Sequence, residues 1–215
     1  MIKWVLLKNN MPSEYYNQSV ELGRQFQTNN PKNWGGNDSK NYHNQIRWLM
    51  DRYQARTVLD YGCGKGQQYQ ELNGYVPSHG APGERTEPMT FQTRINAESV
   101  YKFDPCVEEF AQEPIGQTFD AVICTQVLGS IPDQDMAWIK DKFMNYATKF
   151  VFIGLHNAPP KNKKRIYNAT HLNYERTVEW YQEQFSNWSG PDLYWWFRGI
   201  DTECNNWFIP KLDKE

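Results

Sequence analysis

The chain lacks an excess of positive charge and has no long apolar run near its start. Its 215 residues carry 23 Lys and Arg against 25 Asp and Glu, which gives a formal net charge of -2. Without an overall positive field there is no general attraction for nucleic-acid phosphates, so we expect no nucleic-acid partner. The apolar stretch in MIKWVLLKNN is only four residues long, too short for a signal peptide or a membrane span. We therefore expect a cytoplasmic protein with no membrane partner.

The chain also lacks paired cysteines. Cys63, Cys106, Cys124 and Cys204 form no Cys-x-x-Cys pair and no cluster with histidine at the spacing of metal ligands. Free thiols in a reducing compartment are the simplest expectation. The sequence therefore predicts neither a disulfide framework nor a metal site.

Length and composition favour one globular domain with appendages. A chain of 215 residues exceeds one small core and falls short of two full-sized domains. Hydrophobic residues at 39% and aromatic residues at 15% are enough for a packed interior. Residues 1–40 are polar and irregular, with several turn-forming residues, and we interpret them as an N-terminal extension or cap. The domain itself is expected over residues 41–215.

Segments typical of strands and helices alternate through that domain. Such alternation predicts an α/β fold with a doubly wound, mostly parallel sheet that binds ligands at the carboxyl ends of its strands. Residues 74–98, rich in Gly, Pro and polar residues, predict a long inserted loop or lid. The last two predicted strands have no helix between them, which indicates an antiparallel edge hairpin. The predicted strands are 57–61, 100–104, 119–125, 150–155, 193–197 and 206–210, and the predicted helices are 41–53, 67–72, 133–148 and 176–185.

The most informative segment is VLDYGCGKG at residues 58–66, a hydrophobic strand that ends in an acid and runs into alternating glycines. A strand-to-helix turn whose backbone touches a ligand tolerates no Cβ and often needs positive φ, which explains glycine there. The dinucleotide fingerprint would require its third glycine at position 67, where the chain has Gln67. A phosphate-binding Walker A loop is excluded because Lys65 is not followed by Ser or Thr.

LDYGCGKG resembles motif I of the class I S-adenosylmethionine-dependent methyltransferases, whose acid and three glycines match Asp60, Gly62, Gly64 and Gly66. Two later segments are similar to the same family in the same order. VYKFD ends in Asp104, where the family has an acid, and FDAVICTQVLGSIP at residues 119–132 resembles its fourth strand. The resemblance implies a Rossmann-like fold of seven strands with S-adenosylmethionine as cofactor.

The resemblance also implies roles for individual residues. Asp104 would accept hydrogen bonds from the ribose hydroxyls, and backbone carbonyls after the fourth strand would meet the cofactor's amino group. The insertion at 74–98 places Asp104 44 positions after Asp60, where about 20 is usual. Gly129 and Ser130 replace a Glu-His pair of many relatives. The implied cofactor-binding residues are Asp60, Gly62, Cys63, Gly64, Asp104, Pro105, Cys124, Thr125 and Gln126.

Catalysis and the acceptor are less defined by the sequence. Methyl transfer needs mainly alignment of acceptor and methyl carbon, and His156 and His171 are the candidates for a general base. No Asp-Pro-Pro-Tyr type of motif follows the fourth strand, where the chain has Cys124-Thr125-Gln126-Val127. Pro105-Cys106 occurs in the wrong order and place for the Pro-Cys nucleophile of cytosine-modifying enzymes. The acceptors that remain are a small molecule, a glycan precursor or a protein side chain, and we expect one of the first two. A catalytically silent cofactor-binding module and an NAD-dependent oxidoreductase remain alternatives.

Overall fold

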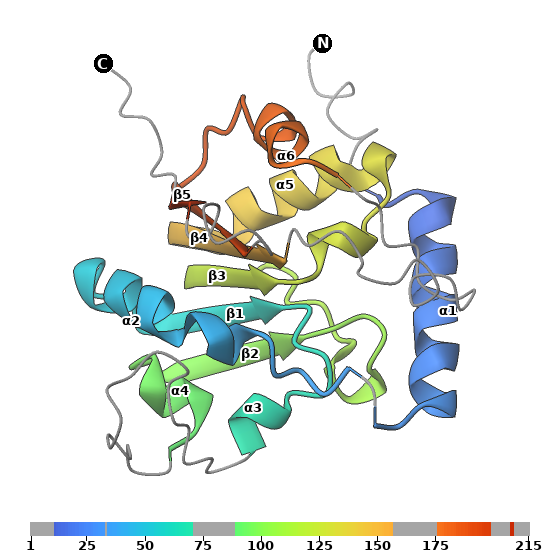
Figure 1. Ribbon diagram of the computed structural model, residues 1–215, viewed down its shortest axis with the longest axis horizontal. Coiled ribbons are helices and arrows are strands. Elements are labelled where there is room, and N and C mark those ends of the chain that lie inside the picture. Colours follow the sequence, from blue (N-terminus) through green and yellow to red (C-terminus); the bar gives the residue numbers. More distant parts are fainter. Residues whose placement is uncertain (1–10, 33, 71–88, 157–175, 199–206, 209–215) are drawn as a thin grey trace.

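The computed structural model describes residues 11–32, 34–70, 89–156, 176–198 and 207–208, which form one sheet with helices on both faces (Figure 1). The strands occur in the order β2-β1-β3-β4-β5-β6, and β1 to β5 are parallel. The α/β class and the parallel sheet expected from the sequence are thereby confirmed. The strands are β1 (Thr57–Tyr61), β2 (Ser99–Phe103), β3 (Phe119–Thr125), β4 (Ala147–His156), β5 (Asp192–Arg198) and β6 (Trp207–Phe208).

The expectation of seven strands is wrong for the described part of the chain, where the sheet has six. The two-residue β6 pairs with β5 in antiparallel orientation. Residues 199–206, which connect these strands, lie outside the described residues, so the expected edge hairpin remains a prediction. The seventh strand is implied by the family resemblance alone, because the apolar runs of the sequence predict only six strands.

The helices divide between the two faces of the sheet, with α2 and α4 on one face and α5 and α6 on the other (Figure 1). Alternate strand residues point to opposite faces, so Leu59 and Val122 join one hydrophobic core while Val58 and Ala121 join the other. The α-helices are α1 (Glu14–Asn29), α2 (His43–Arg52), α3 (Gln67–Gln70), α4 (Phe91–Arg94), α5 (Met136–Tyr146) and α6 (Val178–Gln184). No helix in the described ranges is both long and apolar enough to cross a bilayer.

Helix α1 corrects the expectation that residues 1–40 are irregular. Ser13 caps its start by accepting a hydrogen bond from the Tyr16 amide, and Ser13 also donates from its amide and hydroxyl to Asp135 at 2.6 Å each. The buried residues of α1 are Tyr16, Gly23 and Gln27. Only one of these three is strongly apolar, so hydrophobic periodicity does not reveal the helix.

The expectation of an irregular segment at 74–98 is also wrong in part. Thr90 caps the short helix α4 by accepting from the Thr93 amide, and Phe91 and Ile95 are buried in the core beside α2. Residues 71–88 lie outside the described residues. The described end of the segment therefore belongs to the packed domain.

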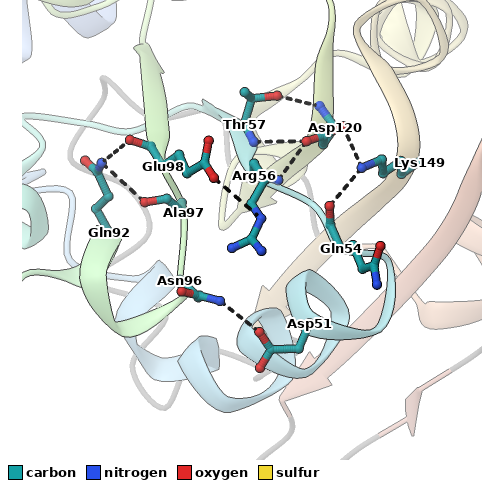
Figure 2. A network of polar contacts seen from close by, with 10 residues as sticks. All are labelled: Asp51, Gln54, Arg56, Thr57, Gln92, Asn96, Ala97, Glu98, Asp120 and Lys149. Carbon is teal, nitrogen blue, oxygen red and sulfur yellow. Dashed lines mark hydrogen bonds and ion pairs between the residues drawn. The ribbon is translucent and has the colours of Figure 1, made fainter.

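A polar network holds the amino-terminal ends of three strands together (Figure 2). Asp120 of β3 accepts from the amides of Arg56 at 2.7 Å and Thr57 at 3.2 Å, and its own amide donates to the Thr57 hydroxyl. Lys149 of β4 forms an ion pair with Asp120 at 3.0 Å and donates to the Gln54 carbonyl. The network fixes the register of β1, β3 and β4 at the edge opposite the glycine loop.

Candidate functional site

The strand order reverses between β1 and β3, and we call this switch point at the carboxyl ends of the strands the crevice. From β1 the chain proceeds outward to β2 on one side, whereas β3, β4 and β5 follow on the other side, so the connections leave in opposite directions. Ligands of open α/β sheets bind at such a switch point, outside the carboxyl ends of the strands. The glycine loop at residues 62–66 leaves β1 here, and Gln126 leaves β3.

The glycines of the loop have the backbone conformation that the sequence predicts. Gly62, Gly64 and Gly66 have φ of 85°, 55° and 61°, in the left-handed region that favours glycine. The amides of Gly62 and Cys63 both donate to the Phe103 carbonyl at the end of β2, at 2.7 and 3.1 Å. The loop is thus held against β2 by its own backbone.

Asp60 is fully buried at the carboxyl end of β1. Its Oδ2 accepts from Gln68 Nε2 at 3.0 Å and from Tyr69 Oη at 2.7 Å, both on α3. Among the described residues no donor reaches its other oxygen, Oδ1. Burial raises the pKa of Asp60 to about 7, against the two hydrogen bonds that lower it, and the negative charges of Asp104 and Asp38 raise it further.

Asp104 follows β2 and holds the glycine loop in place. Its Oδ2 accepts from the Gly64 amide at 2.9 Å and its Oδ1 from the Cys106 amide at 2.8 Å. The carboxyl group is partly exposed, and burial raises its pKa. Each oxygen keeps a further lone pair, so Asp104 can accept additional hydrogen bonds while it supports the loop. The neighbouring Pro105 carbonyl accepts from Arg24 of α1 at 2.9 Å.

Residues 34–42, which we call the strap, run along the outside of the glycine loop. The amides of Lys65, Gln67 and Gln68 donate to the carbonyls of Trp34, Gly35 and Gly36, at 3.0, 2.9 and 3.3 Å. Gly36 has φ of 73°, and a Cβ there would overlap the Cys63 carbonyl. The close approach of two backbones therefore requires glycine on both sides, and the amides that begin α3 already have partners.

The strap also contacts the end of β3. Thr125 and Ser39, both buried, share a hydrogen bond of 2.7 Å between their hydroxyls. Gln126 donates from Nε2 to the Tyr42 hydroxyl at 3.0 Å and from its amide to the Gly154 carbonyl at 2.8 Å. Its φ of 61° is uncommon for a residue with a side chain. The strap therefore joins the two sides of the crevice.

The structure brings most of the sequence-predicted residues to one edge of the sheet. Asp60, Gly62, Cys63 and Gly64 lie on one side of the crevice, Asp104 and Pro105 follow the adjacent β2, and Cys124, Thr125 and Gln126 lie on the other side. Cys63 and Cys124 are buried free thiols, Cys106 is a partly buried free thiol, and Cys204 lies outside the described residues. In the described ranges no three His, Cys, Asp or Glu residues cluster as a metal site would require.

The two candidate bases are not tested. His156 is the last residue of β4, at the same carboxyl edge, but only its backbone is described. His171 lies outside the described residues. Both therefore stay predictions.

Sequence reasoning missed several residues of the site. Gln68 and Tyr69 hold the Asp60 carboxylate, and their place in the first turn of the helix after the loop is the only signal for them. The Gly35-Gly36 pair looks like a turn and indicates no contact with a loop 26 or more residues later. Val127, whose side chain touches Gly62, lies in the segment 119–132 that resembles the family's fourth strand, but no local pattern indicates its contact with Gly62.

Comparisons of the chain with models of protein families, with curated proteins and with solved structures find no match. The case for a function therefore rests on the residues of this site and their geometry.

Proposed function

We propose that the chain binds S-adenosylmethionine in the crevice between β1 and β3 and transfers its methyl group to a small-molecule or glycan-precursor acceptor. The observation that carries the proposal is the buried carboxylate of Asp60, one oxygen of which no described donor reaches, directly before the left-handed glycine loop. Buried polar atoms are normally hydrogen-bonded, so an unpaired carboxylate oxygen in a crevice suits a cationic ligand group. The motif resemblance and this geometry point to the same cofactor.

The charges at the crevice suit a positively charged ligand. Asp60 and Asp104 lie at the same edge of the sheet. The negative charges of Asp104 and Asp38 make ionisation of the buried Asp60 less favourable. The ammonium group of S-adenosylmethionine would offset this repulsion and supply a donor to Asp60 Oδ1. The partly exposed Asp104 has acceptor capacity left for the ribose hydroxyls, in agreement with the role that the resemblance implies.

The same features argue against an NAD-dependent oxidoreductase. Dinucleotide sites bind the pyrophosphate through free amides at the start of the helix after the glycine loop. Here the amides of Gln67 and Gln68 donate to the strap carbonyls of Gly35 and Gly36. The buried carboxylate of Asp60 and the partly exposed one of Asp104 would repel the phosphates as well.

The chain would contribute binding and orientation to the reaction. When bound, the cofactor supplies an electrophilic methyl group on its sulfonium. Gly62 and Gly64 would let it approach the loop backbone, and Thr125 and Gln126 would offer backbone carbonyls to its amino group. Holding acceptor and methyl carbon in line accounts for much of the acceleration of such displacements. His156 would take a proton from an acceptor that carries one.

The proposal is tested first by binding, with unfolding temperature and calorimetry as readouts. S-adenosylmethionine and S-adenosylhomocysteine should each raise the unfolding temperature, and a ligand at 100 times its Kd adds about 2.7 kcal/mol to the free energy of unfolding. NAD should leave it unchanged. Asp104→Ala should abolish the effect of both sulfur compounds, while Glu109→Ala, which removes an exposed acid five positions further on, should not.

Turnover is then measured as release of S-adenosylhomocysteine with pools of small-molecule and glycan-precursor acceptors. Acceptor-dependent release would support the enzyme. Binding without release would identify the chain as a silent cofactor-binding module. No binding of either sulfur compound at millimolar concentration would contradict the proposal.

A further inference from the structure

Val127 lies between the loops that follow β1 and β3. Gly62 has φ of 85°, and a Cβ built on it would overlap Cγ2 of Val127 and lie 3.2 Å from both Cβ and Cγ1. The isopropyl group of Val127 therefore rests directly on the backbone of the first glycine. That surface is the one which a ligand in the crevice would have to touch.

The backbone that presents Val127 is strained. Gln126, the preceding residue, has φ of 61° in the left-handed region, where a residue with a side chain is held only if its surroundings impose it. Its amide donates to Gly154 on β4 and its side chain to Tyr42 in the strap. This left-handed residue turns the chain sharply after β3 and directs Val127 across the crevice.

The opposite side of the glycine loop cannot open as easily. The strap makes three backbone hydrogen bonds to residues 65–68, and Asn37 donates to the Gln67 side chain at 2.9 Å. By contrast, the contact between Val127 and Gly62 consists of van der Waals interactions alone, which are individually weak. Val127 itself is partly exposed and packs against the core that contains Leu59 and Val122. Of the two contacts on the loop, we expect the one with Val127 to need less energy to break.

We propose that Val127 is a gate, whose side chain covers Gly62 and has to leave it before a ligand reaches the loop. The inference rests on the proposed function, because the ligand it admits is S-adenosylmethionine. A gate of this kind lowers the apparent affinity by the fraction of molecules in which it is open. Trimming the side chain removes that penalty without touching Asp60 or Asp104.

The test compares Kd values for S-adenosylhomocysteine by calorimetry in the full chain. Val127→Ala should bind about threefold to tenfold more tightly than the wild type, because the closed state loses its contact. Val127→Phe should bind about threefold to tenfold more weakly than the wild type, since a larger side chain covers more of the loop. The matched control is Val100→Ala, which trims a partly buried valine of β2 that packs in the other core.

A double-mutant cycle on unfolding temperature tests the contact between Gly62 and Val127 without any ligand. Gly62→Ala should lower the unfolding temperature, and adding Val127→Ala should restore part of the loss because the new methyl group then has room. An absence of restoration would show that the two residues do not touch, and would overturn the gate.

The binding outcomes separate the two proposals. Equal Kd values for the wild type and Val127→Ala would overturn the gate and leave the proposed function intact. If the wild type and Val127→Ala both fail to bind either sulfur compound, the proposed function is overturned and the gate with it. Tighter binding by Val127→Ala together with unchanged binding by Val100→Ala supports both the proposed function and the gate.

Discussion

The two edges of the sheet carry aspartates in opposite electrostatic situations. Asp120 at the amino-terminal edge is also penalised by burial, but the Arg56 amide, Lys149 and the Thr57 amide outweigh this, so its pKa is lowered. Asp60 at the carboxyl-terminal edge has two hydrogen bonds that do not outweigh its burial, and its pKa is raised to about 7. The amino-terminal edge therefore holds the strands together through paired charges, whereas the carboxyl-terminal edge contains a buried carboxylate oxygen that no described donor reaches.

The two edges also differ in whether their residues with positive φ have an ordinary explanation. Gln54 and Asn96 also have positive φ, but each lies directly beyond the end of a helix, where a left-handed residue commonly terminates the helix. Gln126 follows a strand, and no helix end accounts for its φ of 61°. Strain that ordinary capping does not explain is found at the carboxyl-terminal edge, as is common at functional sites.

The largest effect is expected from Gly62→Ala. The substitution places a side chain at φ of 85° and pushes it into Val127, and together these should cost about 3 kcal/mol or more of unfolding free energy. Gly116→Ala is the matched control, because Gly116 has φ of 75° with no atom within 4 Å of the added Cβ. Urea titration should show a clearly smaller loss for the control. Equal losses would mean that Val127 does not press on the loop.

The second largest effect is expected at the amino-terminal edge. Asp120→Ala leaves the amides of Arg56 and Thr57 and the Lys149 ammonium without their acceptor, which should cost about 2 to 3 kcal/mol by urea titration. Asp120→Asn keeps one acceptor oxygen and should lose less. A loss below about 0.5 kcal/mol for the alanine variant would contradict the view that this network secures the strand ends.

The pH dependence should separate the two aspartates. The folded pKa of Asp60 lies near 7 and the ordinary value near 3.8, so between these values the folded chain holds a proton that the unfolded chain has released. The stability of the wild type relative to Asp60→Asn should therefore decline as pH rises from about 4 to 7. Urea titrations of both chains at several pH values measure this difference.

Asp120 should show the opposite sign. Its folded pKa is lowered, so the stability it contributes is present above the ordinary carboxyl range and is lost as pH falls through that range. The difference between wild type and Asp120→Asn should therefore shrink in acid. A pH-independent difference for either aspartate would remove the electrostatic contrast between the edges.

The smallest effect is expected for Glu98→Ala. The ion pair between Arg56 and Glu98 has an N to O distance of 3.6 Å, and the two side chains are 49% and 70% exposed. Solvent screens such pairs, so the change should stay within about 0.5 kcal/mol. A larger loss would show that the outer part of the network in Figure 2 also stabilises the edge.

Much of the fold could be predicted because its signals are local. The bounds expected for β1 and β3 agree with the structure, since short apolar runs bounded by turn residues are typical of buried strands. The predicted helix at 133–148 begins instead as a 3-10 turn, Asp133–Asp135, and ends at Tyr146, because Ala147 already pairs in β4. Boundaries depend on tertiary pairing, which no local pattern contains.

The candidate site also has features that local sequence predicts and features that only tertiary contacts decide. Sequence alone determined the strand, the acid Asp60 and the glycine loop, because a left-handed backbone conformation selects glycine residue by residue. Only the tertiary structure decided that the strap covers the loop, that Gln68 and Tyr69 hold one oxygen of Asp60, and that Val127 rests on Gly62. These contacts are made by backbone carbonyls and ordinary side chains, and the strap and Val127 contacts join residues far apart in the chain. Such groups have the same chemistry wherever they occur in a sequence, so no local pattern reveals their partners.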